Sequence, residues 1–229
     1  GLELQSLALY VLASFKRNDQ LSSESGLKYF VLSALSSGLL LYGCSLIYGF
    51  SGSTNFDQIS NNISEVQYGL TLGIVFILVG LAFKISAVPF HMWAPDVYQG
   101  SPTSVTIFFA ILPKIAALSV FIRFLYVPFI NLIDQWQTII IFVSIASMVF
   151  GAVAAIGQKN LKRLMAYSSI SHMGFALAGL AVGTNEGIQS SLIYISIYLL
   201  MNLAFFSCLF MLKRNDIYHE DLSDLSGLS

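Results

Sequence analysis

Two lysines lie inside long apolar runs, where a charged side chain is costly. Lys84 lies within the run from Leu70 to Phe90, and Lys114 lies within the run from Ile107 to Tyr126. An ionisable group at mid-bilayer costs about 2.5 to 3.5 kcal/mol on insertion scales, so it normally faces a hydrated or paired interior and marks an ion path. Neither lysine is within a turn or so of the end of its run, which makes snorkelling to the membrane surface the weaker alternative. The two lysines therefore predict ion transfer.

A proline accompanies each lysine. Pro89 follows Lys84 by five residues, and Pro113 directly precedes Lys114. Proline has no N–H, so the carbonyl four residues earlier loses its helical partner. In lipid such a carbonyl survives only where protein or water satisfies it, and transporters build ion sites at broken helices of this kind. A kink without a chemical role stays open as the alternative, because membrane helices carry proline more often than soluble ones.

His91 is a candidate accessory group near the first proline. It follows Lys84 by seven residues, which is two turns along one face if the helix continues past Pro89. An imidazole can gain and lose a proton near neutral pH. The same side chain could equally cap the broken helix near the membrane surface beside Trp93, so both interpretations stay open.

Other polar residues have simpler explanations. Ser168, Ser169 and His172 form a polar stripe on one helix, for which a hydrogen bond between helices is the favoured interpretation. Lys28 begins its predicted span four residues after Glu24, so we expect an i, i+4 ion pair near the membrane surface.

These residues require helices that cross a membrane. The chain is 56% hydrophobic and 10% charged, with a mean hydropathy of +0.75, which excludes an ordinary soluble domain. We expect an all-α polytopic membrane protein with about seven spans, forming one transmembrane domain over residues 1–229 that is truncated at both ends. The spans are predicted at residues 1–15, 28–50, 67–92, 103–127, 137–157, 162–183 and 188–212.

Cationic residues set the expected orientation of these spans. They gather at Lys16/Arg17, Lys159/Lys162/Arg163 and Lys213/Arg214. An even number of predicted spans separates each cluster from the next, so all three fall on one face. Positive residues collect on the matrix or cytoplasmic side. The sequence leaves open whether the membrane is the mitochondrial inner membrane or a bacterial plasma membrane.

The sequence contains no pattern for a redox or nucleotide cofactor. Its two cysteines, Cys44 and Cys208, lie far apart in apolar runs, whereas an iron–sulfur cluster needs several closely spaced thiolates. Rossmann and phosphate-loop glycine patterns are absent. We therefore expect no cofactor and no metal in this chain, and no nucleic-acid partner.

Four stretches carry a family resemblance. They are GLEL at 1–4, FKISAVPFHMWAPDVYQGSPT at 83–103, PKIA at 113–116 and NLKRLMAYSSISHMG at 160–174. With these stretches the chain resembles the antiporter-like membrane subunits of respiratory complex I, the NADH-quinone oxidoreductase, and most closely the subunit N family, called subunit 2 in mitochondria. The resemblance covers essentially the whole chain, about helices five to eleven of fourteen.

The resemblance implies roles for five residues. Glu3 and Lys84 would form a buried ion pair, Lys114 would be the central proton-carrying lysine, Lys28 would extend the polar axis, and His91 would be accessory. It also implies other membrane-arm subunits as partners, with NADH, FMN, iron–sulfur clusters and quinone on other subunits. The terminal lysine of the family is not in this chain.

The expected function is proton translocation coupled to electron transfer elsewhere in the complex. Separation of Glu3 from Lys84 would free a positive charge that drives a proton off Lys114. A subunit of a cation/proton antiporter or of a membrane-bound hydrogenase is the first alternative. The loop at 97–102 and the lysine at 114, where other members often carry histidine, favour subunit N. A non-conducting membrane scaffold is the second alternative.

Overall fold

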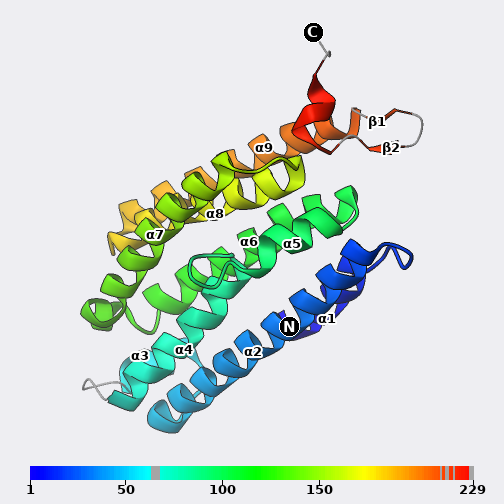
Figure 1. Ribbon diagram of the computed structural model, residues 1–229. Helices are drawn as coiled ribbons and strands as arrows, with labels where there is room; N and C mark the ends of the chain where they lie inside the picture. The colour runs from blue at the N-terminus through cyan, green and yellow to red at the C-terminus, as the bar shows by residue number, and fades with distance from the viewer. Residues whose placement is uncertain (63–67, 212, 215–216, 219, 227–229) are drawn as a thin grey trace.

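The computed structural model describes residues 1–62, 68–211, 213–214, 217–218 and 220–226, so the predicted span ends at 67 and 212 lie outside the described residues. Figure 1 shows a bundle of helices followed by a short hairpin. The elements in chain order are α1 (Leu2–Ala13), α2 (Gln20–Ser51), α3 (Phe56–Asn62), α4 (Tyr68–Lys84), α5 (Trp93–Gly100), α6 (Thr103–Tyr126), η1 (Ile130–Leu132), α7 (Ile133–Ile156), α8 (Leu161–Ala181), α9 (Asn185–Met211), β1 (Lys213–Arg214), β2 (Ile217–Tyr218) and η2 (Leu222–Leu225).

Among the residues that the structure describes, seven apolar helices correspond to the seven predicted spans. Five of them are long and apolar enough to cross a membrane: α2, α6, η1 with α7, α8 and α9. The other two, α1 and α4, are shorter apolar helices. The starts of two spans were predicted too late, since α2 begins at residue 20 and α7 at residue 133. The polar first turn of α2 is helical because the Asp19 side chain caps it, accepting a hydrogen bond from the Leu21 N–H at 3.0 Å.

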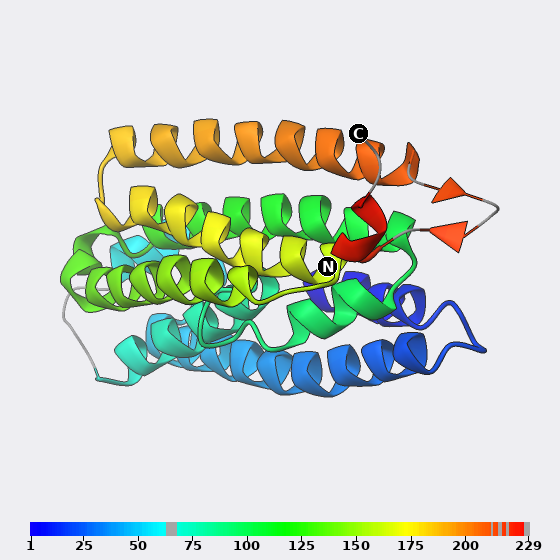
Figure 2. The ribbon, with the colours of Figure 1, turned by 45° about the horizontal axis from the view of Figure 1, so that its top comes forward.

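The helices pack in neighbouring pairs. Helix α2 packs along α4, α7 packs along α8, and α9 covers α8 and α6. Figures 1 and 2 place α2 at one edge of the bundle and α9 at the opposite edge, with α4, α5 and α6 between them. Glycine allows the closest approach: a Cβ added to Gly43 of α2 would lie 2.8 Å from the Gly73 carbonyl oxygen of α4.

The predicted span at 67–92 is not one continuous helix. The sequence indicated a break near Pro89, and the structure has one directly after Lys84. Helix α4 ends at Lys84, Ser86 adopts a left-handed conformation with φ of 57°, and the Val88–Pro89 peptide is cis. A residue in the left-handed conformation cannot continue a right-handed helix, and proline cannot donate a helical hydrogen bond. The helix therefore ends here. Trp93 Nε1 donates to the Phe83 carbonyl at 2.9 Å, which satisfies one end of the break.

The chain resumes as a helix where a loop was predicted. Residues 94–102 were expected to connect two spans, but α5 occupies Trp93–Gly100. The helix has 8 residues and includes the polar residues Asp96 and Gln99, so hydropathy alone does not reveal it. Its residues Trp93, Ala94, Val97 and Tyr98 are almost fully buried. Helix α5 packs against α2, α6 and α8 and therefore lies inside the bundle (Figure 1).

The cation-rich connections lie at one end of the bundle. Figure 1 shows the α1–α2 connection, the α7–α8 connection and the β1–β2 hairpin at the same end, and the α2–α3, α6–α7 and α8–α9 connections at the other. This arrangement agrees with the prediction that an even number of spans separates each cationic cluster from the next. Lys162, from the second of these clusters, is buried, with an exposed fraction of 2%.

Candidate functional site

Lys84 lies in a pocket that α1 and α2 complete. Its side chain is 7% exposed, and Nζ donates to Ser6 Oγ at 2.6 Å and to Ser33 Oγ at 3.2 Å. Glu3 Oε1 lies 3.6 Å from the same nitrogen. The ion pair that the resemblance implied is present, and two serine hydroxyls complete the shell around the ammonium group.

Polar residues at helical spacing build this pocket. Ser33 and Ser37 lie four residues apart on one face of α2, opposite Glu3 on α1. Ser37 donates to the Glu3 carboxylate, and Tyr10 OH donates to Ser33 Oγ at 2.6 Å. The ion pair is therefore part of a hydrogen-bonded group, which lowers the cost of burying it.

In the Glu3–Lys84 pair, the attraction between the two charges is opposed by the cost of removing them from water. Opposite charges about 4 Å apart attract by about 4 kcal/mol at an effective dielectric constant of 20. Desolvation costs several kcal/mol per buried ion. The Glu3 side chain remains 35% exposed, which reduces its share of that cost. The serine hydroxyls and the partial exposure of Glu3 therefore offset part of the cost of burying this pair.

Lys114 has a different environment. Its side chain is fully buried, and Nζ donates to Ser169 Oγ of α8 at 2.6 Å. The Tyr98 ring of α5 lies 5.4 Å from the same nitrogen, within cation–π range. Among the described residues Lys114 forms no ion pair with a carboxylate. Lys114 is therefore shielded from solvent, and no carboxylate compensates its charge in the described part of the chain.

The helix that carries Lys114 is not broken. Pro113 cannot donate to the Phe109 carbonyl, as the sequence predicted, but α6 continues from Thr103 to Tyr126 without a break. Tyr198 of α9, which is 2% exposed, donates its hydroxyl to the Ala110 carbonyl at 3.0 Å in the turn before the proline. A neighbouring helix therefore supports the turn that proline weakens.

Lys28 lies at the cation-rich end, in a group of partly exposed charges. It pairs with Glu24 at 2.6 Å, as the i, i+4 spacing predicted, and with Asp96 of α5 at 2.7 Å. Arg163 of α8 also pairs with Asp96. Burial would raise the pKa of the Asp96 carboxyl, but the hydrogen bonds from Lys28 and Arg163 outweigh it and hold this pKa below its usual value. Asp96 thereby joins three helices.

His91 does not share a helical face with Lys84, because the helix ends before it. The ring packs on Phe150 of α7 with centroids 4.5 Å apart. Its Nδ1 is buried and has no hydrogen-bond partner among the described residues. The alternative in which His91 lies two turns along from Lys84 is therefore wrong, and its accessory role stays a prediction.

The chain matches a family model along its whole length. The model describes the NADH:quinone oxidoreductase/Mrp antiporter transmembrane family and covers residues 1–229. The chain belongs to this antiporter family. It is 79% identical over 229 residues to the NADH-quinone oxidoreductase subunit N of Pelagibacter ubique (strain HTCC1062), covering 100% of this chain and 49% of that protein. Subunit N of Parvibaculum lavamentivorans is 59% identical over 231 residues, with 100% and 48% covered.

The chain is also similar to chains of two solved membrane complexes. A chain of respiratory complex I from Thermus thermophilus aligns with a TM-score of 0.77 and 37% identity, over 90% of this chain and 44% of that one. A chain of the Mrp complex from Dietzia sp. aligns with a TM-score of 0.85 and 25% identity, over 93% and 40%. The protein is thus a multi-pass membrane protein with the antiporter-like fold. It spans about half the length of the curated relatives it matches.

Sequence reasoning missed several residues of this antiporter-family site. Ser6 and Ser33 bind Lys84, and Asp96 binds two cations, yet none of the three was proposed as a site residue. The spacing of Glu3 and Ser6 on one face of a helix was a usable signal. Ser169 was noted as part of a polar stripe, but its bond to Lys114 joins helices far apart in sequence.

His172 and the two cysteines are the other side chains that the sequence analysis singled out. His172 Nδ1 lies 2.7 Å from Tyr194 OH of α9, which confirms the predicted hydrogen bond between helices. Cys44 and Cys208 are exposed. Within the described part of the chain, no three His, Cys, Asp or Glu side chains gather closely enough to hold a metal ion.

Proposed function

We propose that this chain is part of a proton-translocating membrane-arm subunit, subunit N, of NADH-quinone oxidoreductase. The proposal rests on one contrast: Lys84 is buried beside a carboxylate, whereas Lys114 is buried with only neutral groups in hydrogen-bonding contact among the described residues. The relatives in Pelagibacter and Parvibaculum carry the name of this subunit. NADH, FMN, iron–sulfur clusters and quinone would be held by partner subunits.

The proposed mechanism uses the chain's own charges. With Glu3 in place, Lys84 keeps its proton and its positive charge is largely compensated. When quinone reduction elsewhere separates the two side chains, the uncompensated charge on Lys84 raises the cost of a second buried cation, and Lys114 releases its proton along Ser169 and neighbouring polar groups. Lys84 suits the first role because it ends α4 beside the backbone break, where the backbone can rearrange.

The charges at the bundle ends fit a defined orientation. We place the end with Lys16, Arg17, Lys159 and the β1–β2 hairpin on the cytoplasmic side of a bacterial plasma membrane, or on the matrix side of a mitochondrial one. Lys28, Asp96 and Arg163 would then lie at that side of the proton path, and His91 at the break would be an accessory group.

Replacement of the central lysine tests the proposal. In the full-length chain within the reconstituted complex, Lys114→Ala should assemble but lower proton pumping per NADH oxidised by about tenfold or more, equivalent to at least about 1.4 kcal/mol. The control is Lys159→Met, which removes an exposed cation from the connection between α7 and α8. This variant should pump normally. Normal pumping by the Lys114→Ala variant would contradict the proposal and favour the alternative of a non-conducting membrane scaffold.

Ion replacement separates pumping from cation exchange. The likeness to the Mrp complex gives a cation/proton antiporter as the second candidate. A proton pump should work equally in sodium-free and sodium-containing liposomes, whereas an antiporter should move protons only against a cation gradient. The 37% identity to the complex I chain against 25% to the Mrp chain favours the pump.

A further inference from the structure

Lys162 is a buried cation that the proposed mechanism does not use. It is the second residue of α8 and only 2% exposed, although it lies at the end of the bundle where lysines are usually solvated. A buried ammonium group is costly unless it is paired and hydrogen-bonded. Its partners therefore show what the residue holds in place.

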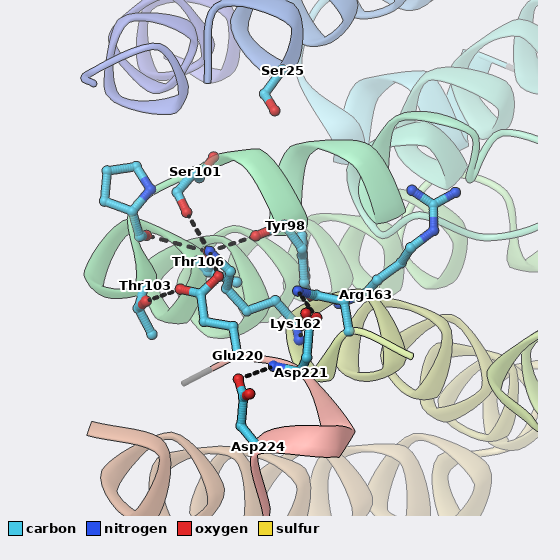
Figure 3. A network of polar contacts seen from close by, with 12 residues as sticks. Ser25, Tyr98, Ser101, Thr103, Thr106, Lys162, Arg163, Glu220, Asp221 and Asp224 are labelled. Atoms are coloured by element: carbon cyan, nitrogen blue, oxygen red, sulfur yellow. Dashed lines mark hydrogen bonds and ion pairs between the residues drawn. The ribbon is translucent and has the colours of Figure 1, made fainter. Parts of the chain in front are cut away.

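The partners of Lys162 come from two distant segments. Nζ lies 2.8 Å from Glu220 Oε2 and donates to the Ser101 carbonyl at 3.0 Å. The other carboxylate oxygen of Glu220 accepts a hydrogen bond from Thr103 Oγ1 at 3.0 Å. Figure 3 shows these side chains converging beside Thr106, which donates to the Tyr98 carbonyl at 3.0 Å. Lys162 and Glu220 therefore both bind the turn between α5 and α6, Lys162 at the Ser101 carbonyl and Glu220 at the Thr103 hydroxyl.

Glu220 belongs to a segment that folds back after α9. We call residues 220–225 the strap. The strap is fixed to the start of α8 by backbone bonds, from Leu161 N–H to the Glu220 carbonyl at 2.7 Å and from Leu222 N–H to the Lys159 carbonyl at 2.8 Å. Asn160 Nδ2 adds a bond to Asp221 Oδ1 at 3.2 Å. The Glu220 carboxylate is therefore held in place by backbone as well as by Lys162.

The turn held by this pair positions the surroundings of Lys114. Ser101 closes α5, which carries the Tyr98 ring beside Lys114, and Thr103 opens α6, which carries Lys114 itself. Lys162 and Ser169 lie seven residues apart, two turns along one face of α8. Helix α8 therefore contacts the α5–α6 unit twice on that face, once through the bond from Lys162 to the Ser101 carbonyl and once through the bond from Lys114 to Ser169.

We propose that Lys162 and Glu220 form a positioning pair that sets the contact between Lys114 and Ser169, and that the strap thereby controls this contact. A shift of the strap that withdraws Glu220 would loosen the α5–α6 turn and change the distance over which Lys114 exchanges its proton. This inference rests on the proposed function, because it gives the pair a role only through Lys114.

Variants that each remove one charge of the pair, made in the full-length chain within the reconstituted complex, test the proposal. Glu220→Gln and Lys162→Met should each lower protons pumped per NADH oxidised by about threefold to tenfold, as expected when a buried cation and its carboxylate are separated. Glu186→Gln, which removes an exposed carboxylate from the far end of α9, and Lys159→Met are the matched controls and should pump normally.

A double-mutant cycle distinguishes positioning from simple structural support. If the pair acts through the contact between Lys114 and Ser169, the losses caused by Glu220→Gln and Ser169→Ala should not add, whereas independent structural damage would add. Should Glu220→Gln fail to assemble, Thr103→Val removes only one hydroxyl from the same group and should show a smaller loss with the same non-additivity.

The outcomes separate this inference from the proposed function. If Lys114→Ala abolishes pumping while Glu220→Gln, Lys162→Met and Thr103→Val pump normally, the positioning pair is wrong and the proposed function stands. Additive losses in the cycle would likewise overturn the positioning pair. Normal pumping by Lys114→Ala would overturn both.

Discussion

The pockets of Lys84 and Lys114 hold the same side chain at similar burial but surround it differently. Lys84 ends a helix and has a carboxylate and two serine hydroxyls beside its ammonium group. Lys114 lies inside a continuous helix, with one serine hydroxyl and the face of Tyr98 nearby. One cation is compensated at a place where the backbone is interrupted, and the other is uncompensated at a place where the backbone is regular.

This difference suits the two lysines to different tasks. A compensated cation keeps its proton, and a neighbouring backbone break allows the partners to separate. An uncompensated buried cation responds most strongly to a new charge in its surroundings, because little water screens it. Under the proposed function, the Lys84 pair would supply the moving charge, and Lys114 would release a proton in response.

A carboxylate placed beside Lys114 should abolish the difference between the pockets. Ser169→Asp would put a negative charge where the serine hydroxyl now accepts the bond from Lys114. At about 4 Å and an effective dielectric constant of 20 this adds about 4 kcal/mol of attraction, close to a thousandfold bias toward the protonated lysine. We expect assembled complex with pumping lowered by more than about tenfold, measured in proteoliposomes against quinone reductase activity.

The matched control for this variant is Ser169→Asn. Asparagine has nearly the shape of aspartate without its charge, so its loss of pumping should be several times smaller. Equal losses in Ser169→Asp and Ser169→Asn would show that packing at α8, and not charge compensation, separates the two pockets.

Much of this contrast could be predicted from the sequence. A lysine in the middle of an apolar run is informative because lipid makes every unpaired charge costly, and that cost does not depend on the fold. The seven apolar segments and their cation-rich connections followed from the same reasoning and match the helices. Glu3 was associated with Lys84 only through the family resemblance.

The remaining features depend on contacts that no local pattern specifies. Pro89 and Pro113 look alike in sequence, yet the chain breaks at the first and stays helical at the second, where α9 supports the turn through Tyr198. Lys162 looks like a loop cation because its carboxylate partner lies 58 residues away in the strap. Long-range partners of this kind decide whether a polar residue is exposed or buried.

Removal of the carboxylate should make the Lys84 pocket resemble that of Lys114. Glu3→Gln keeps the shape of the side chain but leaves Lys84 with hydroxyl partners. Because Glu3 is partly exposed, we expect a loss of roughly 1 to 3 kcal/mol in the free energy of unfolding, below the 3 to 5 kcal/mol typical of a fully buried pair. Pumping should fall several-fold, less than in Ser169→Asp. Denaturant unfolding and proteoliposome assays measure the two effects.

Glu24→Gln provides the comparison for this loss. Glu24 pairs with Lys28 on an exposed face, so its replacement should cost no more than about 0.5 kcal/mol. A cost for Glu3→Gln as small as that for Glu24→Gln would mean that the Lys84 pair is energetically a surface pair and that its separation could not drive Lys114.

The smallest effect is expected at Asp96, which joins Lys28 and Arg163 at the cation-rich end. The folded pKa of this carboxyl lies below its ordinary value of 3.8. The stabilisation is therefore fully present above pH 3.8 and is lost as the pH falls through the lower folded pKa. Asp96→Asn should lower the free energy of unfolding by about 1 kcal/mol. The difference from wild type should be constant between about pH 5 and 8, where the carboxyl is ionised in both states. A difference that changed across that range would mean that another group titrates with Asp96 and that this end of the bundle senses protons as well as holding helices together.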